Sequence, residues 1–136
     1  MPGTRHKART IALQALYEVD SVARQPEMVV ERLLADTKLS AENCDFVRGL
    51  VNGTMKHRDE IDKHIKKLAP AWPINQLALI DRNILRLAIF EILFDNEVPV
   101  KVAVNEAVEL AKTFGSENST KFVNGVLGSV STMTNR

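Results

Sequence analysis

Apolar residues recur at spacings of three and four along most of the chain, which is the spacing of one face of an α-helix. The first such segment begins at Thr4 or Thr10 and runs to about Val22. Strand-like alternation of useful length is missing from the sequence. The pattern therefore predicts an all-α protein. The apolar stripe of the first helix comprises Ala8, Ile11, Ala12, Ala15, Leu16 and Val19.

Two further helices are predicted after the first one. Pro26 interrupts the pattern and suits the first turn of a helix over residues 27–36. Ser40 is a suitable N-cap for a third helix, over residues 41–68. Because that helix would be long for a globular protein, we expect a break near residues 56–58.

The clearest interruption of the helical pattern is Ala69-Pro70-Ala71-Trp72-Pro73. Two prolines within four residues cannot lie inside a regular helix. We interpret this segment as a hinge in a single domain of 136 residues, between helical halves 1–70 and 74–136. Trp72 is expected to pack into the hinge as a wedge.

The C-terminal half shows four helical segments. A short helix over 74–79 precedes a helix over 80–94 that is apolar on nearly all sides, so the latter should lie at the centre of the core. Further helices are predicted over 100–114 and 119–130, with Gly115 ending the former. The sequence thus predicts about seven helices in two stacked subdomains with a shared core.

Composition narrows the class of protein. Apolar residues make up 45% of the chain, as in a globular domain, and no apolar run is long enough to span a membrane. The basic N-terminus is not followed by the apolar segment of a signal peptide, so a cytoplasmic protein is expected. The single cysteine, Cys44, cannot form an internal disulfide and is expected to be an inert, partly buried thiol.

The charge distribution is more informative than the net charge of +1. Before Glu18 the chain carries Arg5, Lys7 and Arg9 and no acidic residue. Such a patch on a nearly neutral protein is typical of a defined anionic contact surface, although a solvated basic tail would have the same composition.

Motifs for catalysis and cofactor binding are missing. No glycine falls in a phosphate-binding loop, and the pair Gly49 and Gly53 is expected to allow close approach of a neighbouring helix. His57, Glu60 and His64 share one helix face and resemble a metal site, but the segment is charged throughout and reads as a solvated face. We therefore expect no enzyme activity, no metal and no cofactor.

Three segments, in the same order, resemble the NusB family of transcription antitermination factors. The resemblance is most specific in the strings Asn-Glu-Ala-Val-Glu-Leu-Ala-Lys and Lys-Phe-Val-Asn-Gly-Val-Leu. It implies two helical subdomains that bind a short single-stranded RNA element, boxA, in leader and ribosomal RNA transcripts. It also implies a partner, the small-subunit ribosomal protein called Nus factor E, and assistance to RNA polymerase in reading through terminators. The segments span residues 5–17, 81–91 and 98–127.

The RNA site is predicted at two places. Arg5 and Arg9, one helical turn apart, should project together and grip phosphate with Lys7, while His6 replaces a cation that the family has there. The resemblance implies a second RNA wall at the start of the last helix. For one member of that wall, Phe122, core packing is an equally good interpretation. The residues of this wall are Asn118, Thr120, Lys121 and Phe122.

A partner-protein surface is predicted from residues away from the apolar stripe. Leu13 and Tyr17 look like an exposed apolar pair for a partner protein, although rim residues that cover the other subdomain would show the same pattern. Asp81 opens the central helix as a carboxylate suited to a basic partner. Arg82 and Arg86 either flank this surface or pair with acids inside the protein. The resemblance also implies that Tyr17 and Asp81 contact Nus factor E.

Four questions stay open at this point. The family often has an acid where this chain has Gly128, which is expected to loosen the last helix. The same fold occurs as the RNA-binding domain of ribosomal-RNA methyltransferases, but a cofactor-binding domain would have to follow Val130, and the sequence ends at Arg136. A DNA-binding regulator would need a basic recognition helix, and none stands out. Family members occur as monomers and as homodimers.

Overall fold

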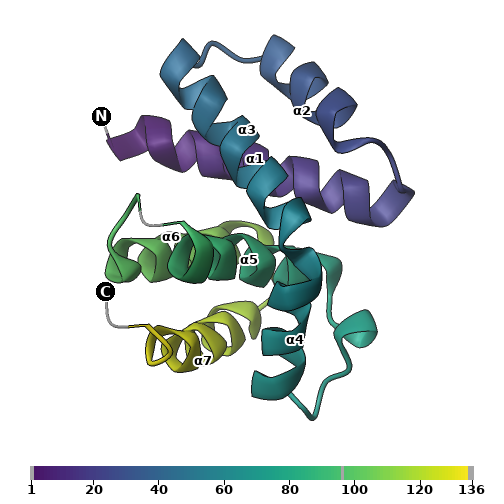
Figure 1. The fold of residues 1–136 in the computed structure, drawn as a ribbon, viewed down its shortest axis with the longest axis vertical. Helices are drawn as coiled ribbons and strands as arrows, with labels where there is room; N and C mark the ends of the chain where they lie inside the picture. The colour runs from purple at the N-terminus through teal and green to yellow at the C-terminus, as the bar shows by residue number, and fades with distance from the viewer. Residues whose placement is uncertain (1, 96, 135–136) are drawn as a thin grey trace.

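The computed structural model describes residues 2–95 and 97–134, and within these ranges the protein consists of helices without strands. In Figure 1, α1, α2 and α3 form the upper part, α5, α6 and α7 lie below them, and α4 runs down beside α7. The prediction of an all-α fold is confirmed. The α-helices are α1 (Pro2–Val22), α2 (Pro26–Ala35), α3 (Ala41–Lys56), α4 (Arg58–Leu68), α5 (Leu79–Ile89), α6 (Val100–Phe114) and α7 (Ser119–Ser131).

The N-terminal helices follow the apolar pattern closely. All six stripe residues predicted for α1 are buried, although the helix begins at Pro2, before either threonine. Thr10 lies inside the helix, where its hydroxyl donates to the carbonyl of His6 at 3.1 Å. Ser40 caps α3 as predicted, because its hydroxyl accepts from the backbone N–H of Asn43 at 3.1 Å.

The predicted break between α3 and α4 falls at His57. The imidazole stacks on the ring of Phe94, with 4.3 Å between centroids, so the turn is packed against the C-terminal half. One turn earlier, Gly53 allows the close approach that was predicted, because a Cβ there would lie 2.1 Å from the ring of Phe90. Gly49 does not, since a Cβ there would meet nothing within 4 Å.

The hinge differs from its prediction. Trp72 does not pack as a wedge, because 58% of the residue is exposed. The expected helix over 74–79 is one 3₁₀ turn, η1 (Ile74–Gln76). Since α4 packs on α5 and α7, the boundary of the N-terminal half at residue 70 stays a prediction.

The central helix is α5, which contacts α1, α4, α6 and α7 and continues into a π-helical turn, η2 (Phe90–Phe94). Side chains from both sides of the hinge join one buried cluster, so the predicted shared core is confirmed. Gly115 ends α6 in an extended conformation, with φ −88°. Glycine is needed there because a Cβ would lie 2.5 Å from the hydroxyl of Ser119.

Candidate nucleic-acid interface

The basic residues at the start of α1 differ in how accessible they are. Lys7 is exposed, and within the described part of the chain no acid pairs with it. Arg5 is half-buried: its guanidinium lies 4.1 Å from the centroid of the Phe46 ring, and its Nη2 lies 3.4 Å from the Glu42 carboxylate. Lys7 is therefore the cation that is best placed for an external phosphate.

Arg9 is buried and paired with acids, which corrects the prediction that it projects beside Arg5 to contact phosphate. It is only 3% exposed, and its Nε and Nη2 donate to the two carboxylate oxygens of Glu91 at 3.0 and 2.9 Å. Nη1 donates to Glu106 at 3.2 Å. Glu91 is itself buried, and burial raises the pKa of its carboxyl even though Arg9 opposes this shift. Arg9 therefore fixes α1 to η2 and α6 instead of projecting beside Arg5.

His6 joins the edge of the same group of charges. Its Nδ1 lies 3.4 Å from the Glu106 carboxylate, which also accepts from Arg9. The imidazole is half-buried, so part of the ring is accessible to solvent while the rest packs against the protein. Its predicted contact with RNA stays a prediction.

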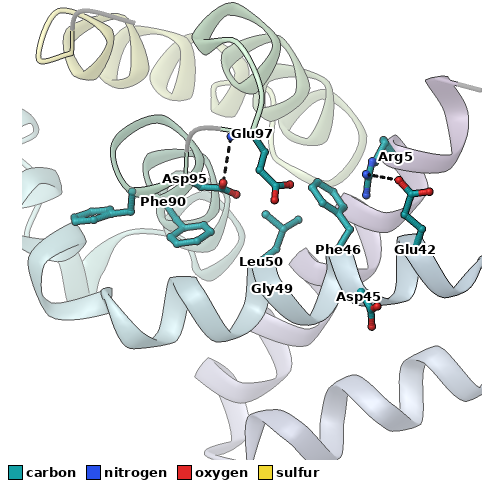
Figure 2. A pocket seen from close by; sticks show the side chains of 10 residues that line it. Arg5, Glu42, Asp45, Phe46, Gly49, Leu50, Phe90, Asp95 and Glu97 are labelled. Atoms are coloured by element: carbon teal, nitrogen blue, oxygen red, sulfur yellow. Dashed lines mark hydrogen bonds and ion pairs between the residues drawn. The ribbon is translucent and has the colours of Figure 1, made fainter.

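Beside Arg5, a cavity of about 580 Å³ opens between α3 and the segment after η2. Figure 2 shows Phe46, Leu50 and Phe90 along its floor, with Arg5 and Glu42 paired at one end and Asp95 and Glu97 at the other. Carboxylates outnumber the single arginine among its lining residues, so phosphate groups are disfavoured here. The acidic residues of the lining are Glu42, Asp45, Asp95 and Glu97.

The second predicted RNA wall lies at the first turn of α7. Asn118 and Lys121 are exposed, while Thr120 and Phe122 are half-buried and Phe122 also packs against the core. Three of these residues line a cavity of about 470 Å³ together with Trp72. Sequence reasoning missed Trp72 at this site, because a lone tryptophan between prolines was interpreted as a packed residue.

The structure does not bring the two predicted RNA elements together. In Figure 1 the basic end of α1 lies beside the marked N-terminus in the upper part, whereas α7 begins in the lower part, near α4. The cavity at Arg5 and the cavity at Trp72 share no lining residue. An RNA strand that contacts both elements would have to extend across the molecule.

The predicted partner surface is only partly exposed. Tyr17 is 41% exposed and lines a groove with Phe114 and Ile80, so it remains accessible to a partner. Leu13 is 1% exposed, which corrects its prediction as an exposed apolar residue. The apolar face of α1 is wide enough to include Leu13, because α2, α3 and α5 all pack against α1.

Arg82 and Arg86 pair inside the protein, so they do not form a free flank of the partner surface. Arg82 donates to Asp20 at 2.8 and 3.0 Å, and Arg86 donates to Asp62 at 2.8 and 2.9 Å and to Asp20 at 3.2 Å. Burial raises the pKa of Asp20, but hydrogen bonds from Asn83 and Arg82 and the charges of both arginines outweigh burial, so the net shift is downward. The cluster connects α1, α4 and α5.

Asp81 lies between the two candidate surfaces. Its carboxylate accepts from the hydroxyl of the buried Ser119 at 2.6 Å, and it lines the cavity that contains Trp72 and Lys121. Its neighbour in sequence, Ile80, lines the groove of Tyr17. A ligand that reaches from Tyr17 to Asp81 would therefore border the second RNA wall.

The described residues include no group of three or more His, Cys, Asp or Glu side chains placed to hold a metal ion. Of the three residues that resembled such a site, His57 stacks on Phe94. Among the residues described, no helix is both long and apolar enough to cross a membrane. Cys44 is half-buried, and its thiol lies 3.8 Å from the carbonyl of Leu39.

Comparisons with known proteins agree over nearly the whole chain. Residues 6–132 match the model of the NusB family. The chain is 55% identical to the transcription antitermination protein NusB of Dehalococcoides mccartyi, covering 96% of this chain and 92% of that one. It is 51% identical to the NusB of Chloroflexus aggregans, covering 94% and 87% of the two chains.

Solved structures show the same likeness. NusB of T. maritima superposes with a TM-score of 0.90 at 32% identity, covering 97% of this chain and 93% of that one. A structure of the antitermination factors NusB and NusE in complex with dsRNA superposes with a TM-score of 0.88 at 28% identity, covering 98% of this chain and 100% of that one.

Proposed function

Because this chain belongs to the NusB family, we propose that it is a transcription antitermination factor that acts by binding and without catalysis. It binds boxA-type single-stranded RNA in leader and ribosomal RNA transcripts, together with the small-subunit ribosomal protein NusE. In the cytoplasm the pair joins the RNA polymerase antitermination complex and helps the polymerase to read through terminators. The observation that carries this proposal is the match to curated antitermination proteins along almost the entire chain.

The proposed RNA contacts combine charge at one end and polar groups at the other. Lys7 and Arg5 supply cations for phosphate, while Asn118 and Lys121 lie exposed at the first turn of α7. The amide of Asn118 can bond to base edges, and single-stranded RNA exposes those edges. A strand extended between the two elements would use both.

The proposed protein contact centres on Tyr17 and Asp81. Tyr17 offers a large, half-exposed aromatic ring beside Phe114, and Asp81 offers a carboxylate to a basic ribosomal protein. Because Arg82 and Arg86 are paired internally, they support this surface from behind and do not contact the partner.

The RNA part is tested by measuring affinity for a fluorescent boxA RNA, for its scrambled sequence and for a duplex of the same sequence. We expect the single-stranded boxA RNA to bind tightest and NusE to strengthen that binding. Lys7→Ala and Lys121→Ala should each weaken binding, whereas Lys66→Ala, an exposed lysine on α4, should not. Equal affinity for all three nucleic acids, with or without NusE, would overturn the proposal.

The partner part is tested with Tyr17→Asp and Asp81→Asn, each measured against NusE alone and RNA alone. Loss of a partly buried aromatic anchor should cost about 2 kcal/mol of partner binding. Asp81→Asn keeps an acceptor for the Ser119 hydroxyl and removes only the charge, so its effect should appear mainly in association rate and salt sensitivity. Glu27→Gln on α2 is the matched surface control. Loss of RNA-only binding with intact partner binding would mean that the two surfaces are reversed.

The same faces are also available to a second copy of the chain. Sedimentation velocity over a range of concentrations will detect a homodimer, and RNA should shift it towards the monomer if pairing covers the RNA surface.

A further inference from the structure

Trp72 is a large aromatic side chain that the fold leaves exposed. It is the only tryptophan of the protein, and 58% of it is accessible to solvent. It lines the cavity of about 470 Å³ with Leu77 and Phe122, which also packs against the core. An aromatic side chain that lines a cavity together with a few polar groups is typical of a ligand site.

The backbone around Trp72 is restrained. Pro70 and Pro73 each fix one backbone dihedral, and the N–H of Trp72 donates to the carbonyl of Ala69 at 3.1 Å. A backbone restrained in this way loses little conformational freedom when a ligand binds. The hinge therefore presents the indole from a restrained backbone.

The polar groups of this cavity suit a nucleobase better than a purely apolar ligand. Asn118 precedes α7 without capping it through its side chain, so the amide is not used by the helix end. Lys121 contributes a cation for the attached phosphate, and both residues are exposed. Unstacked RNA bases are bound in this way, by aromatic stacking together with amide contacts to their edges.

We propose that the cavity formed by Trp72, Leu77, Phe122, Asn118 and Lys121 binds one unstacked base of the RNA, with the base stacked on the Trp72 indole. The proposal rests on the proposed RNA-binding function and adds a specific subsite to it. It also accounts for the separation of the two RNA elements: the charged end of α1 binds the backbone, and this cavity binds a base.

The test uses Trp72 as its own reporter. Full-length protein is titrated with fluorescent boxA RNA while anisotropy reports binding and tryptophan emission reports stacking. We expect emission to fall in parallel with binding. Trp72→Ala should weaken binding roughly five- to a hundredfold and leave the salt dependence unchanged, because no phosphate contact is lost. Trp72→Phe should recover part of the affinity, and Met28→Ala, an exposed side chain on α2, should have no effect.

A series of boxA RNAs, each with one abasic position, locates the base. One position should lose both affinity and quenching, and the loss of affinity should disappear in Trp72→Ala, which has no tryptophan emission to follow. Quenching by NusE alone and not by RNA would assign the cavity to the protein partner and overturn the proposal. If the unsubstituted protein binds RNA tightly without a change in emission, and Trp72→Ala binds with full affinity, the subsite alone is overturned. Absence of any RNA binding would overturn the proposed function.

Discussion

Two ion clusters, one buried and one partly buried, fix the two ends of α1, and their charges are arranged in opposite senses. Near its N-terminus α1 supplies the cation, Arg9, to the carboxylates of Glu91 and Glu106. Near its C-terminus α1 supplies the carboxylate, Asp20, to the arginines of α5. Reversing α1 would place like charges together, and sliding it would leave these charges without their partners, so the two clusters fix the register and direction of the helix.

The comparison also distinguishes basic residues that stabilise the fold from basic residues that are free to bind RNA. Arg9 carries the same charge as Lys7 and lies two residues away, yet only Lys7 is open to solvent. The difference arises because acids of the C-terminal half meet Arg9 inside the protein. Charge alone therefore does not identify an RNA contact, and each cation must be tested for stability and binding separately.

The largest effect is expected from Arg9→Ala. The substitution leaves the Glu91 carboxylate buried without its bidentate partner, which should cost about 3–5 kcal/mol of unfolding free energy. Urea unfolding followed by circular dichroism measures this, with Lys7→Ala as the control that should change stability by no more than about 0.5 kcal/mol. Replacing the pair together, Arg9→Met with Glu91→Leu, should recover much of the loss. If Lys7→Ala destabilises the protein as much as Arg9→Ala does, the distinction between a cation that stabilises the fold and one that is free to bind RNA is wrong.

A pH dependence is expected from the second cluster. The pKa of Asp20 lies below its ordinary value of 3.8, so the folded protein stabilises the ionised form of this carboxyl group relative to the unfolded chain. Its contribution is complete above the unfolded pKa and is lost as the pH falls through the folded pKa. Urea unfolding from pH 7 to pH 3 should show a decline below about pH 4 that is shallower in Asp20→Asn. Asp59→Asn, exposed on α4, should keep the full decline.

Sequence patterns predicted the helices well because their information is local. The stripe of α1, the cap at Ser40 and the break at His57 each depend on residues within a few positions of one another. The π-helical turn η2 was not predictable, since it depends on how Phe90 and Phe94 pack against α3 and His57. The early start of α1 was missed because the sequence offered two threonine caps that the helix does not use.

The candidate site was predicted less completely because it depends on distant pairs. Arg9 and Glu91 are 82 positions apart, and Arg82 and Asp20 are 62 apart, so nothing local shows that these arginines are already paired. Leu13 was taken as exposed because the predicted apolar stripe of α1 was too narrow for a helix on which α2, α3 and α5 all pack. A lone tryptophan is expected to be a core residue from its side-chain type, and only the fold shows that the hinge leaves Trp72 exposed.

An intermediate effect is expected from the exposed cations of α1. Lys7→Ala should lower the slope of log affinity against log salt by roughly 0.7, the value for one lost phosphate contact on single-stranded RNA. Arg9→Ala, measured where it remains folded, should leave that slope unchanged because Arg9 is buried. A reversed result, with Arg9 and not Lys7 changing the slope, would show that RNA binding opens the buried cluster.

The smallest effect concerns Glu42, which competes with RNA for Arg5. The two side chains lie 3.4 Å apart, and because the Glu42 side chain is 83% exposed the pair is held only weakly. Removing the carboxylate in Glu42→Gln should free the Arg5 guanidinium and tighten RNA binding by about twofold to fivefold at low salt, with the gain fading as salt is raised. Fluorescence anisotropy at two salt concentrations measures this.

If the effect of Glu42 acts through Arg5, it must depend on Arg5. In the double variant Arg5→Ala with Glu42→Gln, the gain should therefore disappear. Asp59→Asn supplies the control for a general loss of negative charge, because Asp59 is exposed on α4. Equal gains in Glu42→Gln and Asp59→Asn would mean that net charge alone is responsible. A gain that survives in the Arg5→Ala background would place the effect in the acidic cavity itself, whose other carboxylates repel the same RNA.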